Sequence, residues 1–232
     1  MDTSYCEWKK WNLSNFGILS SINKAYFVKE LKKVKLPPYS KVCDYGFGNG
    51  EFLAFSKYNK WKVTGVEINK NLRKIAKKNN FFVQSPKQFF KTKDQEFDLI
   101  TLFDVIEHFP QAKSEILLRL LRTKLKPNGF ILCRFPNGDS PFSLYHQNAD
   151  PTHCNFIGSK KIKFLANCAK LKIFYLGPQA VPIWKTPFPK WIYNLLKKII
   201  YKIGNLAVQK IFFPKDKDYF FFSANLVCLL KK

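Results

Sequence analysis

The residues best suited to proton transfer are two histidines with acidic neighbours. The segment DVIEHF contains Asp104, Glu107 and His108, and the segment DPTH contains Asp150 and His153. Imidazole titrates near neutral pH, so His108 or His153 could act as a general base. The structural alternatives are that Glu107 and His108 cap the following helix, and that Asp150, which precedes a proline, forms a turn.

Metal binding is a weaker interpretation of the same residues, and we assign no metal ligand. A hard divalent cation on Asp104, Glu107 and His108 would need carboxylate oxygens, which this segment supplies. The six cysteines form no CxxC pair, and several of them lie in apolar runs. We therefore expect a reduced protein without structural zinc.

A second group of residues is suited to binding a small ligand. The segment KVCDYGFGNG (41–50) places Asp44 ahead of three glycines, Gly46, Gly48 and Gly50. Glycine lets the backbone approach a ligand and adopt positive φ, and a helix start behind it offers free N–H groups. Glu67 follows about twenty residues later, where a carboxylate accepts hydrogen bonds from ribose hydroxyls in doubly wound folds.

The elements that must position these residues alternate between strands and helices. Strands are predicted at 41–45, 61–68, 81–84, 97–104, 130–135, 171–177 and 219–230, with a turn at 126–129. Helices are predicted at 16–36, 50–58, 69–79, 112–125 and 191–213. Residues 136–165 are predicted as a long loop that precedes a further helix. This alternation predicts βαβ units, a parallel sheet, and a ligand site at the carboxyl ends of the strands.

Four segments resemble, in order and spacing, the motifs of class I S-adenosylmethionine-dependent methyltransferases. They are VCDYGFGNGEF, VTGVEIN, FDLITLFDVIEHF and LKPNGFILCRFPN. The resemblance covers about residues 38–177 and resumes near 219–230. It implies an α/β, Rossmann-like, doubly wound sheet of seven strands, the last one antiparallel, with helices on both faces.

The resemblance also implies S-adenosyl-L-methionine as cofactor and a set of residues that bind it: Asp44, Gly46, Gly48, Glu67, Ile68, Ser85 and Asp104. Asp44, Gly46, Gly48 and Asp104 would line its methionine end. Glu67 would hold the ribose and Ile68 would touch the adenine. Ser85 stands where the family often has an acid that faces the adenine.

Two further segments are predicted in addition to the core of the methyltransferase fold. Residues 1–36 are predicted as an N-terminal helical cap, and 37–232 as the methyltransferase domain with an insertion at about 178–217. Within that insertion, the helix at 191–213 has one apolar face and one face rich in lysine, with Trp184, Trp191 and Tyr193 beside it. Such a helix lies in a membrane interface, or packs on its own domain or on a second copy in a homodimer.

The net charge of +24 favours a polyanionic partner, although lysine-rich composition alone can produce it. The scarcity of arginine makes a nucleic-acid partner less favoured. The N-terminus shows no apolar signal region, and no apolar run is long enough to span a membrane. We expect a cytoplasmic protein, with peripheral contact at the inner membrane surface as an alternative.

Four functions remain open at this point. VIEH resembles a segment of small-molecule O-methyltransferases, and DPTH resembles a segment of methyltransferases near polysaccharide gene clusters. The second resemblance implies that His153 faces the acceptor and that Asp150 fixes the tautomer of His153 or binds the acceptor directly. The leading hypothesis is therefore O-methylation of a sugar, glycan or lipid-linked glycan. A quinone-type phenolic acceptor is the first alternative and RNA the second. A scaffold that retains the cofactor fold without activity is the third, and the intact glycines with Asp44 and Glu67 disfavour it.

Overall fold

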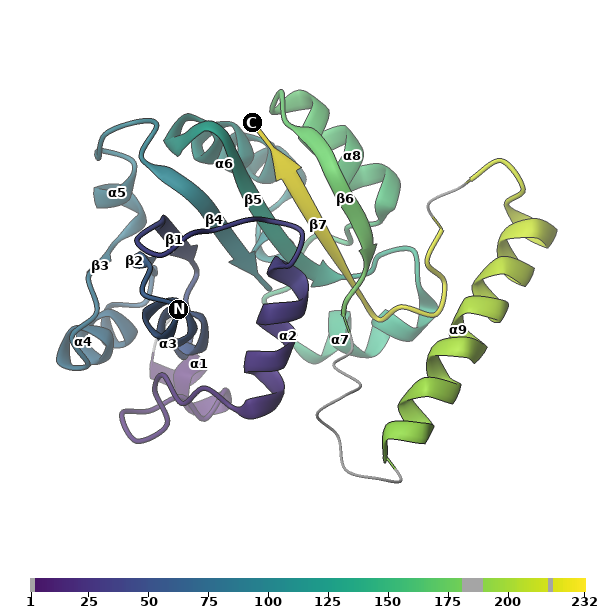
Figure 1. The fold of residues 1–232 in the computed structure, drawn as a ribbon, viewed down its shortest axis with the longest axis horizontal. Helices are drawn as coiled ribbons and strands as arrows, with labels where there is room; N and C mark the ends of the chain where they lie inside the picture. Colours follow the sequence, from purple (N-terminus) through teal and green to yellow (C-terminus); the bar gives the residue numbers. More distant parts are fainter. Residues whose placement is uncertain (1–2, 181–189, 217–218) are drawn as a thin grey trace. The chain divides into compact units, whose positions relative to one another are not determined.

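The computed structural model describes residues 3–180, 190–216 and 219–232 (Figure 1). Its strands form one seven-stranded sheet in the order β3-β2-β1-β4-β5-β7-β6. They are β1 (Lys41–Tyr45), β2 (Lys62–Val66), β3 (Val83–Gln84), β4 (Phe97–Phe103), β5 (Leu125–Pro136), β6 (Lys172–Pro178) and β7 (Asn225–Lys231). β1 is parallel to β2 and β4, whereas β7 is antiparallel to β6. The predicted Rossmann-like α/β class and its antiparallel last strand are confirmed.

The chain divides into two compact units, and the first comprises residues 1–103, 120–132 and 232. Its helices are α1 (Thr3–Trp8), α2 (Ser21–Leu31), α3 (Glu51–Tyr58), α4 (Lys70–Lys78) and α5 (Pro86–Phe89). Phe27 of α2 packs edge-on against Phe52 of α3, and both rings contact Phe103 at the end of β4. This aromatic cluster holds the N-terminal helix α2 to the strand that leads into the DVIEHF segment.

The second unit comprises residues 104–119 and 133–231. It contains η1 (Ile106–His108), the start of α6 (Gln111–Lys124), η2 (Pro141–Ser143), α7 (Leu144–Ala149), α8 (Ser159–Cys168) and α9 (Lys190–Phe212). The buried amide of Asn137 ties the end of β5 to the segment before β7, because it donates to the carbonyls of Phe220 (2.8 Å) and Ser223 (2.9 Å).

Several predicted boundaries are wrong. The helix predicted at 16–36 is confined to α2, because Gly17 has a φ of +70° and Ser20 caps the helix by accepting the Asn23 N–H. The turn predicted at 126–129 lies inside β5, with Asn128 in the left-handed region. The predicted loop at 136–165 contains η2, α7 and the start of α8. Trp184, predicted beside the insertion helix, lies outside the described residues.

Candidate functional site

Asp44 occupies a buried position near the carboxyl end of β1, where it pairs in register with Thr101 of β4. The Thr101 hydroxyl donates to the Asp44 carboxylate at 2.8 Å. Burial raises the pKa of Asp44 to about 7, and the hydrogen bond from Thr101 opposes part of that rise. Within the described residues, the hydrogen bond from Thr101 offsets only part of the cost of burying the ionised Asp44 carboxylate. A cationic group of a ligand beside Asp44 would offset more of that cost.

The glycine loop after β1 requires its glycines. Gly46, Gly48 and Gly50 all have positive φ. A Cβ on Gly50 would lie 2.4 Å from the ring of Phe16, and one on Gly48 would lie 3.0 Å from the ring of Trp11. The N-terminal segment thus places two aromatic rings directly against the loop, with a clash for any Cβ at Gly50 and a tight contact for one at Gly48.

Glu67 follows β2 and is held by backbone donors. Its carboxylate accepts the N–H groups of Gly48 at 3.3 Å and Asn69 at 2.9 Å. Burial raises the pKa of Glu67, and these backbone hydrogen bonds oppose the rise. A carboxylate has about four acceptor positions, so Glu67 retains capacity for hydroxyl donors. Beside it, the Ile68 side chain is 67% exposed and offers an apolar surface.

Two other predicted cofactor residues have structural partners. Ser85 caps α5: its hydroxyl accepts the N–H of Gln88, whose side chain reaches back to the Ser85 N–H. Asp104, directly after β4, has a φ of +55° and forms a two-pronged ion pair with Arg134. The cofactor contacts of Ser85 and Asp104 therefore stay predictions.

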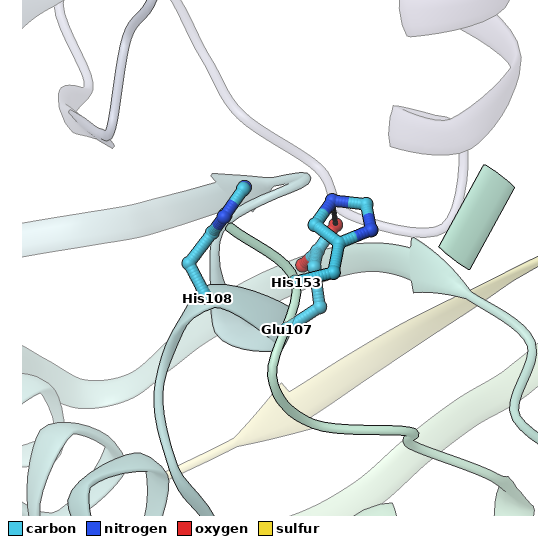
Figure 2. Close-up of side chains that lie close together, drawn as sticks. All are labelled: Glu107, His108 and His153. Atoms are coloured by element: carbon cyan, nitrogen blue, oxygen red, sulfur yellow. Dashed lines mark ion pairs between the residues drawn. The ribbon is translucent and has the colours of Figure 1, made fainter. Parts of the chain in front are cut away.

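The second unit brings Glu107, His108 and His153 together (Figure 2). The segments meet because the Glu107 carbonyl accepts the N–H groups of Cys154 (3.0 Å) and Asn155 (3.1 Å). The His108 and His153 rings stand edge to face with centroids 4.7 Å apart. His153 Nε2 lies 3.9 Å from Glu107 Oε1 and also 3.9 Å from Asp150 Oδ2, so neither contact is a hydrogen bond.

Glu107 is fully buried, and neither of its carboxylate oxygens has a hydrogen-bond partner within the described residues. Burial raises its pKa well above the usual value, and the charges of Asp104 and Asp150 act in the same direction. A buried polar group without a partner is costly. Protonation of the Glu107 carboxyl group, or a hydrogen bond from a ligand to it, would lower this cost.

Asp150 acts on His108 through Thr152. The Thr152 hydroxyl donates to Asp150 Oδ1 at 2.6 Å and lies 2.9 Å from His108 Nδ1. Because a hydroxyl group has one hydrogen, which goes to Asp150, the His108 Nδ1 must carry the hydrogen of that second contact. In neutral His108 the lone pair is then on Nε2. The Asp150–Thr152–His108 chain of hydrogen bonds thus favours one tautomer of neutral His108.

The same three side chains have the chemistry of a cation site. One potential ligand atom each from Glu107, His108 and His153 lie within 4.8 Å of one another. Two imidazole nitrogens with one carboxylate form a donor set that suits a divalent transition metal. First-row ions bind these ligands at about 2.0–2.2 Å, so the three side chains would have to close inward to bind one.

The sequence analysis identified His108, His153 and Asp150, and the structure places all three in one cluster. Thr152 was missed, although it stands between Asp150 and His153 in the DPTH segment. His146 lies elsewhere: it is exposed on α7 and packs against the ring of Tyr145. A hollow of about 330 Å³ lies at the amino ends of β1 and β4, away from the glycine loop, and is lined in part by Pro38 and Lys126.

Comparisons with known proteins identify the family. Residues 22–173 match the methyltransferase domain family. A ubiquinone biosynthesis O-methyltransferase of Hydrogenovibrio crunogenus is 27% identical over 135 residues, 52% of this chain and about half the length (53%) of that relative.

Solved structures show the same fold. A SAM-dependent methyltransferase from Archaeoglobus fulgidus has a TM-score of 0.67 at 21% identity, over 100% of both chains. A putative sarcosine dimethylglycine methyltransferase from Galdieria sulphuraria has a TM-score of 0.60 at 14% identity, over 99% of this chain and 97% of that one. Since the family match covers more than half of the sequence, the chain belongs to the methyltransferase domain family.

Proposed function

We propose that this methyltransferase uses S-adenosyl-L-methionine to methylate a hydroxyl group. The observation that carries the proposal is the Asp150–Thr152–His108 chain, in which the Thr152 hydroxyl donates to Asp150 and lies 2.9 Å from His108 Nδ1. This pattern favours the tautomer in which Nε2 of His108 is the proton-accepting nitrogen. A hydroxyl acceptor must lose its proton when it is methylated, and a fixed imidazole lone pair is suited to take it. The family match supports the methyl transfer, and the Hydrogenovibrio relative supports oxygen as the acceptor atom.

The residues of the first unit fit the cofactor. Glu67 has acceptor capacity for the ribose hydroxyls, and the exposed side chain of Ile68 suits the adenine. The buried Asp44 carboxylate suits a positively charged methionine end, and a nearby cation would favour its ionised form. Gly46 and Gly48 leave room for the backbone to approach. When bound, the cofactor supplies an electrophilic methyl group on a sulfonium ion.

Residues of the second unit would accept the proton that the acceptor hydroxyl loses. His108 Nε2 would take the proton of the acceptor hydroxyl, so that the oxygen could accept the methyl group while the electron pair of the broken S–C bond stays on the sulfur. The imidazolium that results keeps its Nδ1 hydrogen bond to Thr152, whose hydroxyl is oriented by the Asp150 carboxylate. His153 lies in the same cluster, with its ring edge to face against His108 and its Nε2 3.9 Å from the buried Glu107, and it would orient the acceptor.

Two acceptor classes remain, each with its own support. The Hydrogenovibrio relative favours a phenolic, quinone-type hydroxyl, and we place this acceptor first. A sugar or glycan hydroxyl is less acidic than a phenol and so depends more on a general base, which the fixed His108 tautomer supplies. RNA remains the least favoured acceptor.

The test supplies methyl-labelled S-adenosylmethionine and the purified protein with a catechol, with a glycan and glycolipid fraction, or with RNA. We expect label in the catechol or glycan sample, reduced by about 100-fold or more in His108→Gln. His146→Gln is the matched control, because His146 is exposed outside the cluster, and it should leave the rate unchanged. Label confined to RNA, or full activity of His108→Gln, would refute the proposal. Loss of activity with a chelator, restored by a divalent ion, would instead show that the cluster binds a metal.

A further inference from the structure

The insertion helix α9 is attached to its own unit through its polar face. The Phe222 ring stacks on Tyr201 with centroids 5.8 Å apart, and its backbone N–H donates to the Asn205 side chain at 3.0 Å. A Cβ on Gly204 would lie 2.4 Å from the Phe222 ring, so this glycine lets the ring reach the helix. One turn later, the Gln209 side chain donates to the carbonyl of Asp216 at 2.8 Å.

The opposite face of α9 is apolar and exposed. At 100° per residue, the docked residues and the apolar residues fall on opposite sides of the helix. Seven apolar side chains on the outward side are exposed: Ile192, Leu195, Leu196, Ile199, Ile200, Ile203 and Leu206. We call these seven residues the apolar stripe. Among the described residues of its own unit, the seven side chains of the stripe stay exposed.

The charge around the stripe indicates what would cover it. Residues 190–213 contain five lysines and no acidic residue, and at 100° per residue Lys202 lies next to the edge of the stripe. A second copy of the chain would bring like charges together across a two-fold axis, in a protein of net charge +24. An anionic lipid surface covers apolar side chains and attracts lysines at the same time.

We propose that α9 binds the surface of an anionic membrane, with the apolar stripe in the interface and the lysines at the headgroups. The helix lies on the bilayer: within the described residues, no helix is long and apolar enough to cross it. This inference stands on α9 alone and does not depend on the acceptor that the enzyme methylates.

The test is co-sedimentation of the full chain with vesicles of phosphatidylcholine alone or mixed with phosphatidylglycerol. Wild-type protein should bind the anionic vesicles and bind less as salt is added. The variant Ile200→Glu/Ile203→Glu, at two stripe positions that are each 62% exposed, should bind at least about tenfold more weakly. Ile116→Glu is the matched control, because this isoleucine is 57% exposed on α6, and it should bind like the wild type.

Two results would overturn the proposal. If the double variant binds anionic vesicles like the wild type, the net charge acts alone and the stripe has no part. If light scattering shows a dimer that the double variant converts to a monomer, the stripe is covered by a second copy. Circular dichroism of each variant checks the fold, and the substituted side chains are already exposed to solvent.

Discussion

Replacing Thr152 with valine tests whether Asp150 controls His108 through the threonine hydroxyl. Valine has nearly the same shape, and the Thr152 N–H that donates to Asp150 Oδ1 at 3.0 Å is retained. The variant loses the 2.6 Å hydrogen bond to Asp150 and the 2.9 Å contact with His108 Nδ1. A hydrogen bond to a charged group contributes about 1.5–3 kcal/mol. If that stabilisation acts on the imidazolium formed in the transition state, kcat falls by about 10- to 100-fold.

The assay measures kcat and KM across pH with the acceptor found above, for wild type, Thr152→Val and Thr152→Ser. The serine variant keeps the hydroxyl and should retain most of the activity, while the valine variant loses kcat with little change in KM. Nitrogen chemical shifts of labelled His108 should show hydrogen on Nδ1 in the wild type and a mixture of tautomers in Thr152→Val. Equal activity of the two variants, or an unchanged tautomer in Thr152→Val, would refute the reasoning.

Three further predictions concern stability. Because the folded-state pKa of Asp44 is raised to about 7, the ligand-free protein should lose up to about 4 kcal/mol of unfolding free energy between about pH 4 and pH 7, and urea titrations should show this loss abolished in Asp44→Asn. Gly50→Ala forces a Cβ against Phe16 at positive φ, so its urea midpoint should report a loss of at least about 2 kcal/mol. Asn137→Ala removes the side-chain donor of the Phe220 and Ser223 carbonyls, of which the Phe220 carbonyl keeps the Ser223 N–H, and should cost about 1–3 kcal/mol in the same assay.

The core of the fold could be predicted because buried parallel strands leave a strong signal. β1 and β4 are apolar runs covered on both sides, and glycine or acidic residues follow each of them directly. Boundaries were harder to predict where local backbone conformation decided them. Gly17 and Ser20 shorten the N-terminal helix, and Asn128 lets β5 continue through an apparent turn.

In the candidate site, too, positions set by local sequence could be predicted and contacts between distant segments could not. Glu67 could be predicted because its position depends on one strand and one glycine loop, which are near each other in the sequence. The contact between His108 and Thr152 joins residues 44 positions apart, and it depends on the Glu107 carbonyl accepting two N–H groups of the later loop. No local pattern encodes that approach, so the partner of Asp150 was expected to be His153, its neighbour in the DPTH segment.

The insertion helix shows why an amphipathic pattern alone cannot identify the buried face. The period of α9 separates an apolar and a polar side, and the usual expectation is that the apolar side packs inward. Here Gly204 and Asn205, on the polar side, receive the ring and the N–H of Phe222, contacts that only the folded chain provides. Burying the apolar side inward would forfeit these contacts. Seven apolar side chains on one exposed side of the helix, together with five lysines and no acidic residue in 190–213, are the reason why we propose an anionic surface as their partner.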